Sequence, residues 1–379
     1  MTEPFPPSDI GASGNEAART EPNVLLPGQT PEGQYILSLL VKRTYDIQPG
    51  RPCVRAEEDK KLVPGDEHFG DPMNSTVAFE TDFIPYKPAT DVVFNGSAYA
   101  PGGRPVQSLR TALQVGAHRK EVQVMGDRVC QYQPRGFPAV TGPEPFTVME
   151  MRYERAYGGF DIYSDPQLPC AYPRNHLGKG FVLRNTPDSV NNLELPNLEN
   201  PNDPLSQSRL FVEEIRHWER QPMPQSFGWF GKSWYPRAQR AGVMPADREV
   251  EQELRKAYAA ALPPEQRKMY EEHGLPDMDF CFFNGASPGL AVPFLCGDEE
   301  VRLENLVPEG LLTFHLPGER PQVGLDFGLE LREPEVFLHT VQIRIDEQRR
   351  QVDLVWRAAA EYPGPDWLPE MKKLEILIR

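Results

Sequence analysis

Proline is the feature that most constrains how this chain can fold. It occupies 41 of the 379 positions, whereas about 5% is usual in proteins, and the prolines are spread along the whole chain. Proline lacks a backbone N–H donor and kinks or breaks a helix from within. The sequence therefore excludes a bundle of long helices and predicts many short elements joined by fixed turns.

The length of the chain allows one large domain or two domains, since about 150 residues is a typical domain size. Charged residues make up 25% and aromatic residues 10%, a composition typical of globular proteins. Residues 1–33 differ, because they are rich in Pro, Gly, Glu, Thr and Asn and poor in apolar residues. We predict a flexible tail over 1–33 and a single large β-rich domain over 34–379.

The net charge of −15 indicates which kinds of molecule the protein is able to bind. Nucleic acids and anionic membranes need basic surfaces, so we expect binding to neither, whereas a basic protein partner is favoured. The first residues lack the pattern of a secretory signal, and no apolar run reaches the ~18 residues of a membrane span. The five cysteines form no C-x-x-C pair and are odd in number. We therefore expect reduced thiols and a soluble, cytoplasmic protein.

The clearest strand pattern is a hairpin within residues 108–129. From 109 to 115, apolar and β-branched residues alternate with Arg110, Ala112 and Gln114, and Val122 and Val124 resume the alternation after a turn. This period of two predicts an antiparallel pair with one buried face. Further strands are predicted at 35–47, 53–63, 91–106, 280–285, 300–306, 310–316, 337–346 and 351–358.

Helical patterns are confined to one region. Residues 245–262 place apolar side chains on one face between Pro245 and Pro263, and a second short helix is expected over 264–274. We predict a mainly β (α+β) protein of sandwich-like antiparallel sheets with long loops and a helical insertion at about 206–275. The segments 91–103 and 279–289 also resemble each other, which indicates either an old duplication or two ordinary Asn-Gly turns after strands.

The sequence offers no residue that we assign to catalysis, to cofactor binding or to metal binding. The phosphate-binding, dinucleotide-binding, zinc-protease, esterase and calcium-loop motifs do not occur in the sequence, and no two of the seven histidines lie within five residues. Acids cluster at Glu150, Glu154 and Asp161 and at Asp277 and Asp279. Paired acids are able to hydrolyse a sugar, but acids beside arginines more often form ion pairs.

The densest stretch is MRYERAYGGFD, residues 151–161. We interpret it as a structural corner in which Arg152, Glu154 and Arg155 form ion pairs and Gly158 and Gly159 allow a sharp turn. Its aromatic residues are expected to fix the corner to the core, namely Tyr153, Tyr157 and Phe160.

A second unusual stretch, FGWFGKSWYPR over 227–237, is dense in aromatic residues. Such residues either fill a core or form a recognition surface, and the core is the favoured reading. If exposed, they are the best partner-binding candidates in the chain: Phe227, Trp229, Phe230, Trp234 and Tyr235.

The order of these stretches resembles one bacterial family, the domain of unknown function 2169 (DUF2169), over roughly residues 34–360. The most specific segments are TDVVFNGSAYAPGG, YERAYGG and NHLGKGF. The family motif residues are Arg152, Tyr153, Glu154, Arg155, Tyr157, Gly158, Gly159, Asn175, Gly178 and Gly180. Two positions depart from the expected pattern, since His339 stands where we expect an acid and His176 is the first variable residue of its loop.

This resemblance implies a role in type VI secretion. It implies an adaptor or chaperone, not an enzyme, that holds a secreted effector protein and helps load it onto the spike. The spike partner would be a valine-glycine repeat protein or a PAAR (proline-alanine-alanine-arginine) tip protein. Two alternatives remain open: a carbohydrate-active hydrolase that uses paired carboxylates, and a structural β module of a larger assembly.

Overall fold

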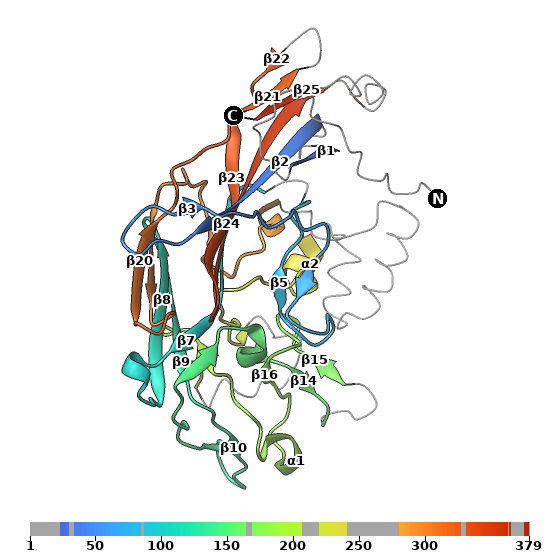
Figure 1. Ribbon diagram of the computed structural model, residues 1–379. Helices are drawn as coiled ribbons and strands as arrows, with labels where there is room; N and C mark the ends of the chain where they lie inside the picture. Colours follow the sequence, from blue (N-terminus) through green and yellow to red (C-terminus); the bar gives the residue numbers. More distant parts are fainter. Residues whose placement is uncertain are drawn as a thin grey trace.

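The computed structural model describes residues 23–29, 34–84, 87–163, 169–206, 220–240, 280–326, 331–362, 364 and 375–378. Strands dominate the described part and form several mainly antiparallel sheets (Figure 1). The predicted helices at 245–262 and 264–274 lie outside these residues, as does most of the predicted insertion at 206–275. None of the described helices has the length and apolar character needed to cross a membrane.

The largest sheet has seven strands. Their order is β1 (Asn23–Gln29), β2 (Tyr35–Asp46), β24 (Arg350–Glu361), β23 (Val336–Ile345), β6 (Thr90–Asn95) and β18 (Ala291–Val292), with β3 (Val54–Arg55) also paired to β2. All pairs are antiparallel except β23 with β6. The predicted hairpin of 337–346 and 351–358 is confirmed as β23 and β24, and the strand predicted at 53–63 is reduced to the two residues of β3.

A five-stranded sheet contains the predicted 108–129 hairpin. Its order is β17 (Leu198–Glu199), β9 (His118–Met125), β8 (Ser108–Val115), β19 (Glu300–Glu304) and β20 (Leu311–His315). Side chains from β2, such as Leu39, share one hydrophobic cluster with side chains from β8 and β9, such as Leu113 and Val122. The two sheets therefore share a core, and a sandwich-like arrangement stays a prediction.

The other face of the seven-stranded sheet is buried as well, but it is polar. Strand alternation places Lys42 and Thr44 of β2 opposite the apolar residues that face the core. Lys42 pairs with Asp82 at 2.8 Å, and Gln342 of β23 donates to the carbonyl of Ala78 at 2.7 Å. Residues 56–84, which include β4 (Glu67–His68) and β5 (Val77–Phe79), therefore cover this face through polar contacts.

The remaining elements are short, as the proline content predicts. The strands are β7 (Ser97–Tyr99), β10 (Cys130–Gln131), β11 (Ala139–Val140), β12 (Val148–Glu150), β13 (Tyr157–Gly158), β14 (Phe160–Asp161), β15 (Cys170–Ala171), β16 (Lys179–Gly180), β21 (Val323–Asp326), β22 (Leu331–Arg332) and β25 (Glu375–Ile378). The helical segments are η1 (Pro101–Gly103), η2 (Tyr153–Arg155), α1 (Pro187–Val190), α2 (Arg237–Arg240) and η5 (Phe280–Phe283).

Two sequence predictions are corrected here. The tail predicted over 1–33 contains a strand, because the apolar residues 24–26 lie in β1, which pairs with β2 along its length. The strand predicted at 280–285 is instead the 3₁₀ helix η5, which the Arg237 guanidinium holds through the carbonyls of Phe282 and Phe283.

The idea of a duplicated β unit finds no support, since β6 and η5 differ in secondary structure. The two similar segments instead contact each other. Asp91 of β6 accepts hydrogen bonds from the side chain of Asn284 and from the backbone N–H groups of Gly285 and Ala286, at 3.0–3.1 Å.

Candidate functional site

The YERAYGG segment forms a buried corner, but its contacts differ from the predicted ion pairs. Glu154 accepts hydrogen bonds from the backbone N–H of Thr76 at 2.8 Å and from the Thr76 hydroxyl. Arg152 pairs with Glu150 at 3.2 Å, and Arg155 donates to the side chain of Asn197 at 3.4 Å. The acid thus holds the covering segment 56–84 against η2, because Thr76 belongs to that segment.

Asn175 links the two most specific motifs. Its side-chain amide donates to the carbonyls of Tyr153 at 2.8 Å and Tyr157 at 3.1 Å. Gly158 has φ +151° and lies so close to Asn175 that a Cβ there would sit 2.0 Å from the Asn175 carbonyl oxygen. Strands β13 and β16 pair beside this contact and bring Gly180 against Gly158. The glycines are needed for this close approach of two backbones.

The aromatic stretch 227–235 fills the core rather than forming a surface. Phe227, Trp229, Phe230 and Trp234 are buried, and Tyr235 is half-buried. The ring of Tyr153 packs edge-on against Phe230 and Trp234, with centroids 5.9 and 4.9 Å apart. The favoured interpretation, a core, thus describes Phe227, Trp229, Phe230 and Trp234, which form no exposed surface, and a partner-binding role for the stretch stays a prediction. Conversely, the sequence predicts that Phe160 packs in the core, and this prediction is wrong, because its side chain is 52% exposed.

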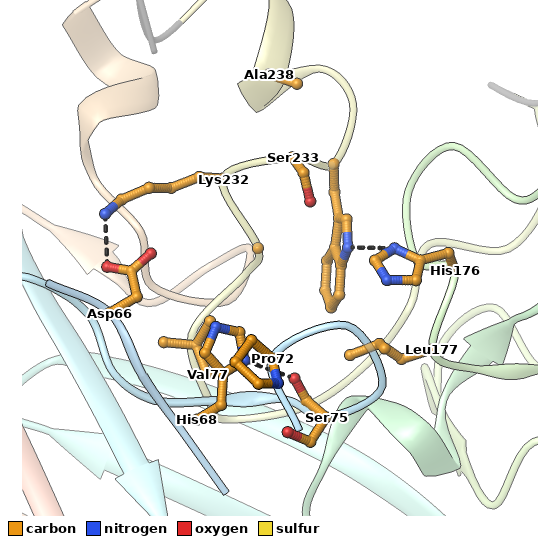
Figure 2. Close-up of a pocket in the computed structure, with 12 residues that line it drawn as sticks. Asp66, His68, Pro72, Ser75, Val77, His176, Leu177, Lys232, Ser233 and Ala238 are labelled. Atoms are coloured by element: carbon orange, nitrogen blue, oxygen red, sulfur yellow. Dashed lines mark hydrogen bonds and ion pairs between the residues drawn. The ribbon is translucent and has the colours of Figure 1, made fainter. Parts of the chain in front are cut away.

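A pocket of about 480 Å³ opens beside this aromatic core. Its walls come from three separate segments: residues 66–77 of the covering segment, the loop 176–177, and residues 231–238, which run into α2. Figure 2 shows Asp66 and Lys232 on one side, His176 on the other, and His68, Pro72 and Ser75 below. Ligand pockets usually have about 300–1,000 Å³, so this cavity is large enough to bind a small group.

Hydrogen bonds determine which pocket atoms donate and which accept. Trp234 donates its indole N–H to Nδ1 of His176 at 3.2 Å, so Nε2 of that ring donates to the Met73 carbonyl at 3.3 Å. His68 donates from Nδ1 to the carbonyl of Ser75 at 2.8 Å, because a carbonyl oxygen only accepts. Lys232 donates to Oδ1 of Asp66 at 2.6 Å.

Two segments that meet at His176, a residue of the pocket wall, carry exposed hydrophobic side chains. They are Phe69, Met73, Phe160, Ile162 and Tyr163, which we call the rim patch and which form five of the ten large hydrophobic side chains exposed in the described part of the chain. The Phe160 ring lies 6.0 Å from the His176 ring, and His176 bonds to the Met73 backbone. The two segments that carry the patch, 69–73 and 160–163, therefore meet at His176.

Buried charges anchor the other side of the pocket wall. Arg237 of α2 pairs with Glu80 at 2.5 Å and donates to the carbonyls of Phe230, Phe282 and Phe283. Lys87 pairs with Asp91 at 2.7 Å beside it. This network ties residues 230–240 to the seven-stranded sheet and so holds the wall in place.

Lys120 is a buried lysine that the sequence analysis did not identify. Lys120 shares the inward face of β9 with Val122 and Val124, and its Nζ donates to Oγ of Ser287 at 2.6 Å. Tyr153 donates to the same oxygen at 2.9 Å. Burial lowers the pKa of Lys120 to about 7 and raises that of Tyr153. The signal was available, because position 120 falls on the inward side of the alternation that defines the hairpin.

The acids considered for catalysis have other uses where they are described. Asp161 is buried, and its two oxygens accept from the backbone N–H groups of Tyr163 and Leu183. Asp277 and Asp279 lie outside the described residues. Cys296, Asp298 and Glu299 lie near one another at the surface, but Glu299 accepts from the backbone of Cys296 and Gly297, which explains its position in the turn.

One comparison with known proteins gives a match. A family model described as an uncharacterized protein conserved in bacteria (DUF2169) matches residues 32–357. Comparisons with curated proteins and with solved structures found no match.

Proposed function

We propose that this chain, which belongs to the DUF2169 family, acts as an adaptor or chaperone that binds a type VI secretion effector. In this proposal it helps to load the effector onto the spike, at a valine-glycine repeat protein or a PAAR tip protein. It does so in the cytoplasm as a binding protein that needs no cofactor. The resemblance of the motifs to the family suggests the role, and one feature of the structure supports it.

That feature is the rim patch. Met73 is 73% exposed, and Phe160, Ile162 and Tyr163 each are about half exposed. Exposed apolar side chains that group together on a surface mark sites of protein association, and methionine and aromatic residues are enriched where proteins meet. A pocket beside the patch offers a place for an anchoring side chain of the partner.

The charge of the chain fits the same role. A net charge of −15 attracts basic surfaces over long distances and raises the rate of association with them. The apolar patch would supply affinity, and the surrounding charge would supply selection among partners.

Purification of the tagged full chain from its native host tests this proposal. We expect an effector encoded in the same operon, or a spike component, to co-purify with the chain. We also expect the level or the secretion of that effector to fall when the gene for this chain is deleted. The proposal fails if no such protein co-purifies and the effector is unchanged by the deletion.

Surface variants sharpen the test. Met73→Glu and Phe160→Glu place a charge on the rim patch and should abolish co-purification without unfolding the chain. Phe137→Glu is the matched control, because Phe137 is 58% exposed and lies outside the patch. Equal loss with all three variants would show that the patch is not the binding surface.

The rival functions predict other results. A carbohydrate hydrolase would need two free carboxyls facing a sugar, whereas Glu154 and Asp161 each have both oxygens occupied by internal donors. A structural module of a larger assembly would form large particles alone, and size-exclusion chromatography of the purified chain distinguishes these from a monomer or dimer.

A further inference from the structure

We propose that the pocket beside the rim patch binds an arginine side chain of the partner protein. This inference rests on the proposed function and names the chemistry that the site would recognise. The pocket presents two hydrogen-bond acceptors that would bind such a side chain, and one of them belongs to Asp66.

Within the described ranges, the internal donors of Asp66 all reach the same oxygen. Oδ1 accepts both from Nζ of Lys232 at 2.6 Å and from the backbone N–H of Thr81 at 2.9 Å. Among the residues that the structure describes, Oδ2 has no donor. The side chain lines the pocket and is 23% exposed. In Figure 2 the second oxygen points away from Lys232. A carboxylate oxygen is thus open to an incoming donor.

His68 presents a second acceptor. Its Nδ1 carries the proton donated to Ser75, so the neutral ring has its lone pair on Nε2. Nε2 has no partner in the described part of the chain, and the ring lines the same pocket. Both ring nitrogens of His176 already form hydrogen bonds, one with the indole of Trp234 and one with the backbone carbonyl of Met73. Oδ2 of Asp66 and Nε2 of His68 are therefore both hydrogen-bond acceptors, and a ligand of this pocket should supply donors.

Of the protein side chains, the guanidinium group of arginine best matches these two acceptors. It carries five N–H donors, has no acceptor and remains charged at all relevant pH values. The indole of Trp234 lines the pocket, and aromatic rings attract guanidinium groups. Lys232 also faces the pocket, but its charge is shared between Asp66 and Glu80, the latter at 3.9 Å. A delocalised guanidinium tolerates that neighbour better than a compact ammonium group does.

The surroundings indicate that the arginine belongs to a protein. The cavity of about 480 Å³ exceeds one side chain, and the rim patch would contact apolar residues that flank the arginine. The chain's net charge of −15 favours a basic segment over a neutral or acidic one.

Direct binding to the full-length chain tests the proposal. The probe is N-acetyl-arginine amide, compared with the N-acetyl amides of citrulline and lysine and with free arginine, by calorimetry or ligand-observed NMR. Citrulline has nearly the shape of arginine without the charge. We expect saturable binding of the arginine probe, and binding of citrulline weaker by about tenfold or more, since citrulline forms no charge-assisted hydrogen bond with the carboxylate.

Asp66→Asn is the decisive variant. Asparagine keeps Oδ1 for Lys232 and Thr81 and turns the open oxygen into a donor that opposes a guanidinium. We expect about tenfold weaker binding of the arginine probe with little change in the melting temperature. The control is Asp188→Asn, which makes the same charge change at an exposed residue of α1, an element that contributes no residue to the pocket wall. His68→Leu should also weaken binding, which keeps the test open if Asp66→Asn fails to fold.

Each outcome is informative. Equal binding of citrulline and arginine, equal binding by the Asp66→Asn variant, or no saturable binding overturns the inference. Tighter binding of free arginine than of its capped amide also overturns it, since the pocket would then serve a small molecule. If Asp66→Asn retains the partner in co-purification while Met73→Glu loses it, the adaptor function stands and the arginine pocket falls. If no partner is found but the probes bind as expected, the pocket stands and the adaptor function falls.

Discussion

Trp234 donates its indole N–H to Nδ1 of His176 across 3.2 Å, and this bond connects the aromatic core to the rim patch. Trp234 packs against the buried Tyr153 ring, whereas His176 contacts the exposed Phe160 ring and the backbone of Met73. The position of the patch therefore depends on a residue that is anchored in the core. This link makes the variable loop position, His176, a determinant of the surface.

Replacing His176 by alanine should destabilise the fold and loosen the patch. The buried indole N–H of Trp234 would lose its acceptor, which costs about 1–3 kcal/mol. Urea unfolding should show this loss, while His118→Ala, at the end of the β8–β9 hairpin, should change the unfolding free energy by less than about 0.5 kcal/mol. An unchanged midpoint for His176→Ala would mean that the bond contributes nothing to stability.

Glu154→Gln tests whether the corner is structural. The glutamate accepts twice from Thr76, so an amide group would place a donor against the Thr76 hydroxyl. We expect a loss of about 1–2 kcal/mol in unfolding free energy, with weaker partner binding only as far as the fold loosens. Glu150→Gln is the control, because the Glu150 side chain is 46% exposed. Loss of partner binding at unchanged stability would place Glu154 in the interface instead.

The close contact at Gly158 predicts a larger effect. A methyl group there would lie 2.0 Å from the Asn175 carbonyl oxygen, in a backbone conformation that favours glycine. Gly158→Ala should cost more than about 3 kcal/mol, measured by thermal or urea unfolding. Gly142→Ala meets no atom within 4 Å and has ordinary φ, so it should unfold like the wild type. If both variants unfold alike, the two motifs do not need this approach.

Local patterns in the sequence predicted the strands well, because burial of one face imposes a period of two. The alternation at 109–115 became β8, and the apolar run at 35–47 became β2. The run Phe280–Phe283 misled the same reasoning, since an apolar segment of four residues is compatible with a strand or a helical turn. Tertiary contacts with Arg237, distant in sequence, accompany the helical turn there.

The pocket could not be predicted in this way. Its walls join residues near 66, 176 and 232, and none of the three segments carries a recognisable ligand motif. The aromatic density at 227–235 correctly marked an important segment, but density alone does not tell which side faces water. The structure shows that this segment faces the core, where the Tyr153 ring packs on Phe230 and Trp234.

Lys120 gives the chain a pH-dependent stability that can be measured. Burial lowers its pKa to about 7, whereas the unfolded chain keeps a value near 10.5. Between these values the unfolded state binds more protons than the folded state, so stability rises with pH, by up to about 1.4 kcal/mol per pH unit. Below pH 7 both states are protonated, this slope disappears, and the folded state bears the full cost of the buried charge.

Lys120→Met should therefore stabilise the protein at neutral pH and remove the rise in stability between pH 7 and 10. Methionine loses the bond to Ser287, but that oxygen still accepts from Tyr153 and donates to the Ser226 carbonyl. The net gain at pH 7 should be on the order of 2 kcal/mol, since a buried charge without a charged partner is replaced by an apolar chain. Urea unfolding at several pH values measures both effects. Lys61→Met, at an exposed position, should keep the slope. A variant that is less stable than the wild type at pH 7, with the slope unchanged, would show that Lys120 is charged and well solvated in the folded protein.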